Sequence, residues 1–580
     1  MKQGRLTVSI VVLALWFGVL LVRLFDLQVR RHQSYSQRAE HQQQQAVKLD
    51  PPRGTIFDAR ARELAVSVEV RSVAADPTAI ADPSATANPL AEVLGLDAER
   101  LAEDLASDRA FVWVRRKLDP PQVERVRALG LRGVFTLPES KRYYPMGSLA
   151  AQVLGYVGTD NTGLAGLEFR YQSVVASTPG RRVVVRDARF DTALLPALER
   201  AEATPGQDLH LTLDAAIQHL AERELAAAVD GSGARGGTVV VMDPRTGAVL
   251  AMASYPTFDP NRFAASPPSH WRNRAVMDAY EPGSTFKMVT LAAALEANVV
   301  DPLEKIDCEM GGITLRGVRI KDHRPFGALT TREIIARSSN VGAIKLGFAA
   351  GRQRLHATIE KFGFGRPTGI DLPSESAGIL RPLERWTELQ PAYVAFGQSL
   401  SVTALQLTRA FAAIANGGYL LRPYVVARPV PEGGERRQVV GMPIAPSSVI
   451  QVRSMLESVV LAGTGKAAAV PHYRVAGKTG TAEKAYPGRG YVDGKYVASF
   501  VGFAPVDRPA VVCTVVLDEP WPAYHGGQVA APVFSAIVGK TLLYLGIPPD
   551  GEGYESPLAE APGPLLAAVT GRAAAASEAM

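Results

Sequence analysis

Three short motifs, separated by long stretches of chain, constrain this sequence most. Ser284-Thr285-Phe286-Lys287 comes first, Ser338-Ser339-Asn340 follows, and Lys478-Thr479-Gly480-Thr481 comes last. A serine and a lysine at positions i and i+3 lie on one face of a helix. There the amine can take the proton of the hydroxyl and convert it into a nucleophile for acyl transfer. A Ser-x-x-Lys tetrapeptide alone is weak evidence, whereas the three motifs in this order strongly favour a catalytic site.

The residues around the serine favour the catalytic interpretation. Pro282-Gly283 would break any regular element before it, and the run 288–295 is apolar on nearly all sides. A helix that is apolar all round is normally buried in the core of a large domain. We therefore expect Ser284 at the N-terminus of a central helix, where unpaired N–H groups favour developing negative charge. The alternative is that Ser284 only caps the helix, a role that is compatible with catalysis.

The first two motifs supply the groups needed to attack a carbonyl. Ser284 would provide the nucleophilic hydroxyl. Lys287 would act as its base, provided that burial keeps part of the amine unprotonated. Ser338 and Asn340 would provide a hydroxyl and an amide, which suit the relay of a proton to the leaving amine and the binding of a substrate amide.

The third motif predicts a binding strand beside the nucleophile. Residues 474–481 are typical of an edge strand, in which Lys478 supplies positive charge. Thr479 and Thr481 supply hydroxyls for a substrate carboxylate, and Gly480 lets a peptide backbone come close. The N–H groups of Ser284 and Thr481 could form an oxyanion hole. Taken alone, Lys-Thr-Gly would more simply be a strand end followed by a turn.

Composition excludes several other classes of protein. The chain has 580 residues, too many for one hydrophobic core, and its 47% apolar and 21% charged residues are typical of globular domains. The net charge of +6 is too small for a nucleic-acid-binding footprint. The histidines show no metal-ligand spacing, no phosphate-binding loop is present, and Cys308 and Cys513 are too few for a disulfide framework. We predict neither a metal nor a cofactor.

An uncharged run, Leu6 to Val22, predicts a membrane anchor over residues 6–23, after a short cytoplasmic segment 1–5. At about 1.5 Å per residue, such a helix almost spans a hydrocarbon core of roughly 30 Å. The alternative is a cleaved signal peptide, but the end of the run lacks the small residues of a cleavage site. Basic residues flank the run on both sides and do not decide its orientation. A large downstream domain translocates regardless of charge, so we expect everything after about Leu24 outside the cytoplasm.

The remaining chain divides into a non-catalytic region, 24–205, and a catalytic domain, 206–547. Nothing between 50 and 200 forms a chemical site, although 101–129 has helical patterning. In the second domain, 209–213 alternates like a strand, 215–229 is typical of a helix, and 237–243 with 248–253 predicts a hairpin. Further strands are predicted at 496–503 and 510–517. A sheet built from both ends of the domain, with helices packed against it, gives a mixed α/β fold. Residues 548–580 predict a disordered tail.

From about Arg53 to Gly546 the chain resembles the class B penicillin-binding proteins, monofunctional D,D-transpeptidases of peptidoglycan synthesis. Besides the three motifs, the resemblance rests on Arg53-Gly54-Thr55-Ile56-Phe57-Asp58, Gly163 to Glu168, Tyr280-Glu281-Pro282-Gly283, Phe396-Gly397-Gln398, Thr403 to Gln406, Ala415 to Gly418 and Ala482. One departure is Ala59-Arg60-Ala61-Arg62, where relatives usually have an Asn-Gly turn. It lies far from the catalytic motifs in the sequence.

The resemblance implies a mixed α/β transpeptidase domain with a central antiparallel sheet flanked by helices. It also implies an elongated α+β pedestal before that domain and a catalytic domain on the extracytoplasmic (periplasmic) side of the inner membrane. The catalytic residues would be Ser284, Lys287, Ser338, Asn340 and Lys478. The substrates would be peptidoglycan stem peptides, with β-lactams as inhibitors.

Within the class, Tyr280 to Gly283 and Arg332 to Gly342 resemble the division (septal) branch more than the elongation branch. Relatives in that branch work with a SEDS-family membrane glycan polymerase and other division proteins, and the anchor and the pedestal motifs around Arg53 and Glu168 would serve that contact. Alternatives are an elongation-specific transpeptidase and a non-catalytic division scaffold, against which the intact catalytic set argues. A class A β-lactamase is excluded because the Glu-x-x-Leu-Asn element is absent, and a β-lactam sensor would have several membrane helices.

Overall fold

The computed structural model describes residues 2–32, 44–49, 51–178, 180–185, 200–201, 204–429, 437–486, 488 and 490–550. Most of the predicted tail, 551–580, lies outside the described residues. The chain forms two compact units. Unit 1 comprises Met1–Gly54, Ser67–Lys141 and Ala176–Gln207, and unit 2 comprises Thr55–Val66, Arg142–Val175 and Asp208–Met580.

Unit 1 begins with a long apolar helix. Helix α1 spans Lys2–Phe25 and continues as one π-helical turn, Asp26–Arg30. In the part of the chain that the structure describes, one helix is long and apolar enough to cross a membrane. Its large apolar side chains are exposed, unlike those of the apolar helices in unit 2. The predicted N-terminal apolar helix is therefore confirmed.

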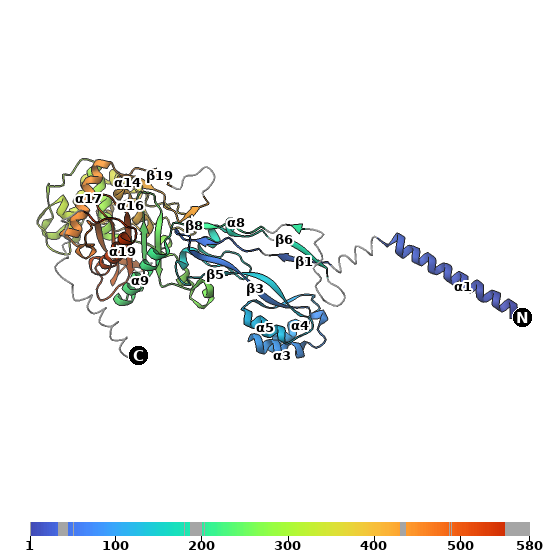
Figure 1. The fold of residues 1–580 in the computed structure, drawn as a ribbon. Coiled ribbons are helices and arrows are strands. Elements are labelled where there is room, and N and C mark those ends of the chain that lie inside the picture. The colour runs from blue at the N-terminus through green and yellow to red at the C-terminus, as the bar shows by residue number, and fades with distance from the viewer. Residues whose placement is uncertain are drawn as a thin grey trace, which may run out of the picture. The chain divides into compact units, whose positions relative to one another are not determined.

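The remainder of unit 1 is a small α+β body. Strand β3 (Glu63–Ala75) pairs there with β4 (Val112–Leu118) and β5 (Val134–Tyr143). Helices α3 (Pro83–Leu94), α4 (Ala98–Leu105) and α5 (Pro120–Ala128) lie together (Figure 1) and bury leucine and valine side chains against the strands. Strand β6 (Gly180–Val185) pairs antiparallel with β1 (Gln44–Leu49) and β7 (Arg200–Ala201). The helical pattern predicted over 101–129 is wrong in its middle, where β4 separates α4 from α5.

The central sheet of unit 2 joins strands from the two ends of this domain, as predicted. Its order is β10-β9-β22-β21-β20 and every neighbouring pair is antiparallel. The strands are β9 (Gly236–Met242), β10 (Val249–Tyr255), β20 (Ala476–Tyr486), β21 (Gly490–Ala504) and β22 (Val511–Asp518). Strands β9 and β10 form the predicted hairpin, and β20 is an edge strand.

Helices cover both faces of this sheet. Side chains along each strand point alternately to the two faces, so each face packs against its own set of helices. On one face Val239 and Val241 pack with α9 (Ala215–Ser232) and α19 (Ala531–Tyr544). On the other face Met242 and Val512 pack with α11 (Lys287–Glu296), α16 (Ala404–Ala415) and α17 (Pro446–Leu461). The predicted mixed α/β fold with a central antiparallel sheet flanked by helices is confirmed.

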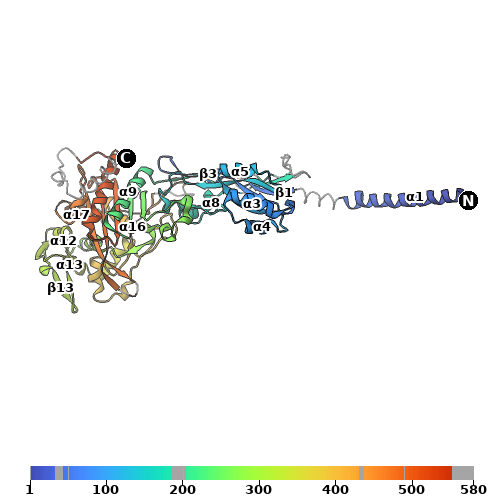
Figure 2. The same cartoon turned by 90° about the horizontal axis from the view of Figure 1, so that it is seen from below.

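Shorter elements surround this framework. Helix α12 (Thr331–Arg337) lies beside α13 (Asn340–Ala350), near the hairpin of β13 (Gly312–Leu315) and β14 (Val318–Lys321) (Figure 2). The other elements of unit 2 are β2 (Ile56–Phe57), α6 (Ala151–Leu154), α7 (Gly166–Arg170), α8 (Gln172–Val175), β8 (Leu209–Leu211), α10 (Arg274–Met277), β11 (Ala279–Tyr280), β12 (Lys305–Asp307), β15 (Ala328–Thr330), α14 (Arg352–Lys361), α15 (Gln390–Ala395), β16 (Val402–Thr403), β17 (Leu420–Leu421), β18 (Val426–Arg428), β19 (Val439–Gly441) and α18 (Gly526–Val529).

Candidate active site

The first motif forms a tight turn that leads into a buried helix. Residues Gly283–Phe286 form one 3₁₀ turn, and α11 proper begins at Lys287. Ser284 is partly exposed in this turn, whereas every residue from Lys287 to Leu295 is buried. The backbone N–H of Gly283 donates to the carbonyl of Gly397 at 3.0 Å, which anchors the turn from outside. The expected central helix is therefore present, and the serine lies one turn before its first residue.

The second motif is held by two helix ends that meet at Ser338. Helix α12 stops there because Ser338 adopts a left-handed conformation, with φ 59° and ψ 38°. The next residue, Ser339, caps α13: its hydroxyl accepts a hydrogen bond from the N–H of Gly342 at 2.9 Å. Ser339 is fully buried and thus structural. Ser338 and Asn340, on either side of it, project their side chains toward the lysines.

Asp322, the residue after β14, fixes this second motif from the other side. Its carboxylate accepts hydrogen bonds from the hydroxyl of Ser339 at 2.7 Å and from the N–H of Val341 at 3.1 Å, and also a short hydrogen bond from the N–H of Asn340. A carboxylate at the N-terminus of a helix is stabilised both by these donors and by the helix dipole. Asp322 therefore fixes the position of the loop that carries Ser338 and Asn340.

The two motif lysines converge on the hydroxyl of Ser338. The Nζ atom of Lys287 donates to the carbonyl oxygen of Ser338 at 2.6 Å, to its Oγ at 3.3 Å and to Oδ1 of Asn340 at 2.8 Å. The Nζ atom of Lys478 donates to the same Oγ at 2.9 Å. Both lysines are fully buried. The structure thus brings Lys287, Ser338, Asn340 and Lys478, from three distant motifs, into one hydrogen-bonded cluster. Ser284 precedes this cluster by one turn, in the 3₁₀ turn before α11.

Burial changes the protonation of both amines. Desolvation lowers the pKa of Lys287 to about 7, against the opposing attraction of the Asp322 carboxylate. Desolvation also lowers the pKa of Lys478, and repulsion from Lys287 lowers it further. Desolvation also lowers the pKa of His323, and repulsion from Lys287 lowers it further. At neutral pH the Lys287 amine is therefore partly unprotonated and can accept a proton.

The third motif lies on edge strand β20, directly against the Gly283–Phe286 turn that carries Ser284. A side chain at Gly480 would come within 2.4 Å of Oγ of Ser499 and within 3.0 Å of the carbonyl oxygen of Pro282. Glycine is therefore required at this position for the packing of β20 against the turn. The hydroxyl of Thr479 is 2.7 Å from that of Thr464, and the hydroxyl of Thr481 accepts from the N–H of Gly526 at 3.0 Å.

Two groups of the site were not predicted from the sequence. Asp322 follows a short hairpin, and Thr464 stands in a loop, so neither carries a local pattern that indicates chemistry. The alternating residues of β13 and β14 are the only sequence signal that could have predicted the end of a strand just before residue 322. Within the described residues, no group of three or more His, Cys, Asp or Glu side chains could hold a metal ion.

Comparison with known proteins identifies the family. Residues 237–539 match the penicillin binding protein transpeptidase domain and residues 48–211 match the penicillin-binding protein dimerisation domain. The chain is 36% identical over 554 residues to the probable peptidoglycan D,D-transpeptidase PenA of Neisseria gonorrhoeae, covering 94% of each chain. It is 34% identical over 553 residues to the peptidoglycan D,D-transpeptidase FtsI of Escherichia coli K12, covering 93% of this chain and 91% of that one. Penicillin-binding protein 3 of Mycobacterium tuberculosis, solved with aztreonam, has a TM-score of 0.67 and 30% identity over 88% of this chain and all of that one.

The chain belongs to the class B penicillin-binding proteins. It is a peptidoglycan D,D-transpeptidase, in which a penicillin-binding transpeptidase domain follows a dimerisation-type domain. The predicted family and enzyme class are therefore confirmed.

Proposed function

We propose that this protein cross-links peptidoglycan stem peptides through an acyl-enzyme on Ser284. The observation that carries the proposal is the buried Lys287 amine, held by Ser338 and Asn340 one helical turn from Ser284, with its pKa lowered to about 7. An amine in this state can accept the proton of the serine at neutral pH. The family membership supports the same reaction.

In the acylation step Oγ of Ser284 attacks the carbonyl carbon of the penultimate residue of the donor peptide, and its proton passes to Nζ of Lys287. The tetrahedral intermediate then expels the terminal residue as an amine, which receives a proton through the hydroxyl of Ser338. This relay is supported by the hydrogen bonds from both lysines to that hydroxyl. The amine of a second stem peptide then attacks the ester carbonyl and loses one proton to Nζ of Lys287. This proton passes to Oγ of Ser284 as the ester bond breaks, which frees the serine and completes the cross-link.

Strand β20 would bind the donor peptide and the developing charge. The backbone N–H groups of Ser284 and Thr481 would stabilise the oxyanion, each donor contributing roughly 3 kcal/mol in comparable sites. The terminal carboxylate would lie between Lys478, Thr479 and Thr481. Because a nearby carboxylate favours the charged form of an amine, substrate binding would raise the lowered pKa of Lys478.

Acylation by a labelled penicillin tests the proposal on the full-length, detergent-extracted protein. Wild-type protein should be labelled covalently on Ser284, and Ser284→Ala should lose the label while its thermal unfolding is unchanged. Ser269→Ala, at an exposed serine outside the site, is the matched control and should label normally. Covalent labelling of folded Ser284→Ala would overturn the assignment.

We further propose that the enzyme acts in septal wall synthesis. The division-type sequences at 280–283 and 332–342 and the similarity to FtsI support this role. A fluorescent fusion should gather at the septum, and depletion should give filaments with unseparated septa. Uniform lateral labelling with rounding of the depleted cells would instead indicate an elongation enzyme.

We also propose that α1 is an uncleaved anchor with its N-terminus in the cytoplasm and the rest of the chain outside. The length and apolar character of α1 support a single span. The mature protein extracted from membranes should keep its N-terminal sequence, and protease added outside should digest the catalytic domain. A shortened soluble form as the main product would contradict this arrangement. A SEDS-family polymerase is the proposed membrane partner.

A further inference from the structure

A cavity separate from the candidate catalytic cluster lies at one end of the central sheet of unit 2. Its volume is about 390 Å³, within the range of small-molecule sites. The sheet contributes the start of β9, the end of β22 and residues 483–485 of β20, and the segment 272–281 forms the opposite wall. None of the eight residues predicted for catalysis or substrate binding lines it.

Two segments connect this cavity to the candidate active site. Glu281 lines the cavity and precedes Ser284 by three residues, so their Cα atoms are at most about 11 Å apart. Strand β20 lines the cavity with Glu483, Lys484 and Ala485 and carries the Lys478–Thr481 motif a few residues earlier. A ligand of the cavity would therefore be a close neighbour of a peptide bound along β20.

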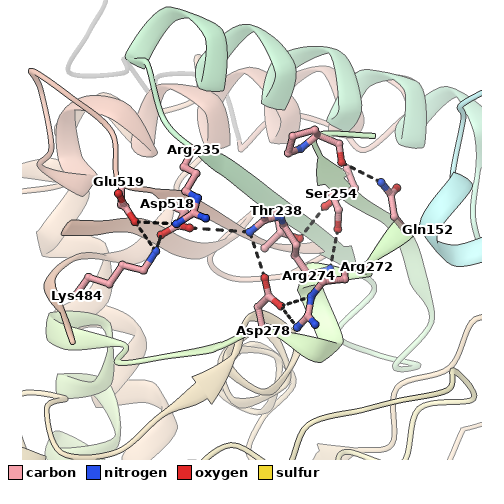
Figure 3. Close-up of polar contacts among 12 residues, drawn as sticks. Gln152, Arg235, Thr238, Ser254, Arg272, Arg274, Asp278, Lys484, Asp518 and Glu519 are labelled. Atoms are coloured by element: carbon pink, nitrogen blue, oxygen red, sulfur yellow. Dashed lines mark hydrogen bonds and ion pairs between the residues drawn. The ribbon is translucent and has the colours of Figure 1, made fainter. Parts of the chain in front are cut away.

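The cavity wall carries both signs of charge. In Figure 3, Arg272 and Arg274 converge on Asp278, at 2.7 Å and 3.2 Å, and Lys484 contacts Asp518 at 2.6 Å. Lining residues with cationic side chains are Arg272, Arg274 and Lys484, and those with acidic side chains are Asp278, Glu281, Glu483 and Asp518. A ligand with one carboxylate and one ammonium can pair with both sets without leaving a buried charge alone.

Tyr280 adds an unfilled hydrogen-bonding position. Its hydroxyl group is buried and has no hydrogen-bond partner among the described residues, and its side chain lines the cavity. Buried hydroxyl groups in proteins are nearly always paired, so an unpaired one facing a cavity suits a polar ligand. Met277, Val497 and Val516 supply the apolar part of the lining.

We propose that this cavity binds a zwitterionic group, a free ammonium and a free carboxylate on one carbon, carried by a residue upstream in the donor peptide. This inference rests on the proposed function. An added peptide that pairs antiparallel with edge strand β20, with its C-terminal carboxylate at Lys478–Thr481, has its preceding residues beside Glu483–Ala485. A diamino dicarboxylic acid in the stem peptide has this chemistry.

The test compares two peptides that end in the same dipeptide and differ at one upstream residue, either a diamino dicarboxylic acid or norleucine. Binding is measured by calorimetry on full-length Ser284→Ala protein, which cannot be acylated. We expect the zwitterionic peptide to bind roughly tenfold more tightly. The double change Arg272→Gln with Asp278→Asn should abolish this preference. The matched control, Arg262→Gln with Asp259→Asn, changes an ion pair outside the cavity and should retain it.

A second variant keeps the test decisive if the double variant does not fold. Ala279 is exposed and lines the cavity, so Ala279→Trp narrows it without disturbing the core and should also remove the preference. Equal binding of the two peptides, or a preference that survives Ala279→Trp, would overturn the proposal. Failure of penicillin to acylate wild-type Ser284 would instead overturn the proposed function, and the two failures are thus distinguished.

Discussion

At the scale of single residues, the site depends on two amines that share one hydroxyl. Lys287 and Lys478 both donate to Oγ of Ser338 and both are fully buried. Two like charges in one buried site are unfavourable without a compensating charge. In the absence of substrate, we therefore expect at most one of the two amines to carry a positive charge. In the proposed mechanism, the carboxylate of an incoming donor would supply the compensating charge. We therefore expect substrate binding and activation of the base to be coupled.

The pKa of Lys287 predicts how acylation depends on pH. Its unprotonated form, the base, predominates above about pH 7, so the second-order rate of penicillin acylation should rise through about pH 7 and level off above it. Lys287→Ala should reduce the rate by roughly 100-fold or more. Lys361→Ala, at an exposed lysine, should leave the profile unchanged. A rate that is flat between pH 5.5 and 8.5 would contradict the role of Lys287.

Asp322 gives a second prediction, with an effect that loss of stability alone would not produce. Asp322→Asn removes the charge that raises the pKa of Lys287, so the midpoint of the acylation profile should move to lower pH. The rate should also fall, by roughly tenfold, because the loop carrying Ser338 and Asn340 loses its charged anchor. Asp301→Asn, which changes a surface turn carboxylate, is the control. If the rate of acylation fell but the pH midpoint of the profile did not move, Asp322 would have only a structural role.

The residues that the sequence predicted for the site are those whose chemistry is local. Ser284 and Lys287 are separated by about one helical repeat, and Lys478 to Thr481 lie on one strand. Each set can therefore be recognised from neighbouring residues in the sequence. Asp322 joins the site through a hydrogen bond to Ser339, 17 residues away, and Thr464 through one to Thr479. Such contacts arise from the tertiary packing of loops, and loops have no sequence periodicity from which the contacts could be predicted.

At the scale of elements, strong periodic patterns were predicted correctly and mixed ones were not. The β9–β10 hairpin and the late strands β21 and β22 contain continuous apolar runs, and α9 has helical spacing. Strand β4 was missed because Arg115, Arg116 and Lys117 interrupt its alternation and its neighbours on both sides are helical. Ser284 lies before α11, in a 3₁₀ turn. A hydrogen bond from Gly283 to Gly397 anchors this turn, and such a contact between distant segments leaves no local sequence pattern.

The contact between β20 and the Gly283–Phe286 turn predicts a strict requirement for glycine at position 480. In Gly480→Ala the added methyl group would approach Ser499, Thr285 and the carbonyl of Pro282 too closely. We expect a loss of about 1–3 kcal/mol in unfolding free energy and a marked fall in acylation rate, because the turn that holds Ser284 must shift. Gly231→Ala, in α9 with no atoms near the new methyl group, should instead stabilise by up to about 1 kcal/mol. Thermal unfolding and penicillin labelling measure both.

At the scale of the whole molecule, the residues first expected to contact a partner are buried inside their own units. Arg53 is 3% exposed and Glu168 is fully buried. Glu168 forms a buried ion pair with Nε of Arg142 at 2.5 Å. Breaking such a pair typically costs about 3–5 kcal/mol, so a change at Glu168 would act through stability. If the proposed membrane polymerase contacts unit 1 directly, exposed residues of that unit must form the contact.

Phe111 and Trp113 are the best candidates for that contact. Both are more than one third exposed, their rings meet edge to face at 4.9 Å, and the guanidinium of Arg116 lies 5.0 Å from the ring centre of Trp113. Exposed aromatic and arginine side chains are enriched in the energetic centres of interfaces. Trp113→Ala should therefore weaken the complex with the polymerase by roughly tenfold or more. Trp521→Ala, at an exposed tryptophan of unit 2, is the matched control.

Complex formation and penicillin acylation are to be measured on the same preparation of each variant. Because Trp113 belongs to unit 1 and Ser284 to unit 2, acylation should proceed at the wild-type rate in Trp113→Ala. Full retention of polymerase affinity would exclude this aromatic pair as the contact. Loss of acylation with the complex intact would mean that unit 1 supports the catalytic unit itself, because a substitution in unit 1 would then have slowed the chemistry in unit 2.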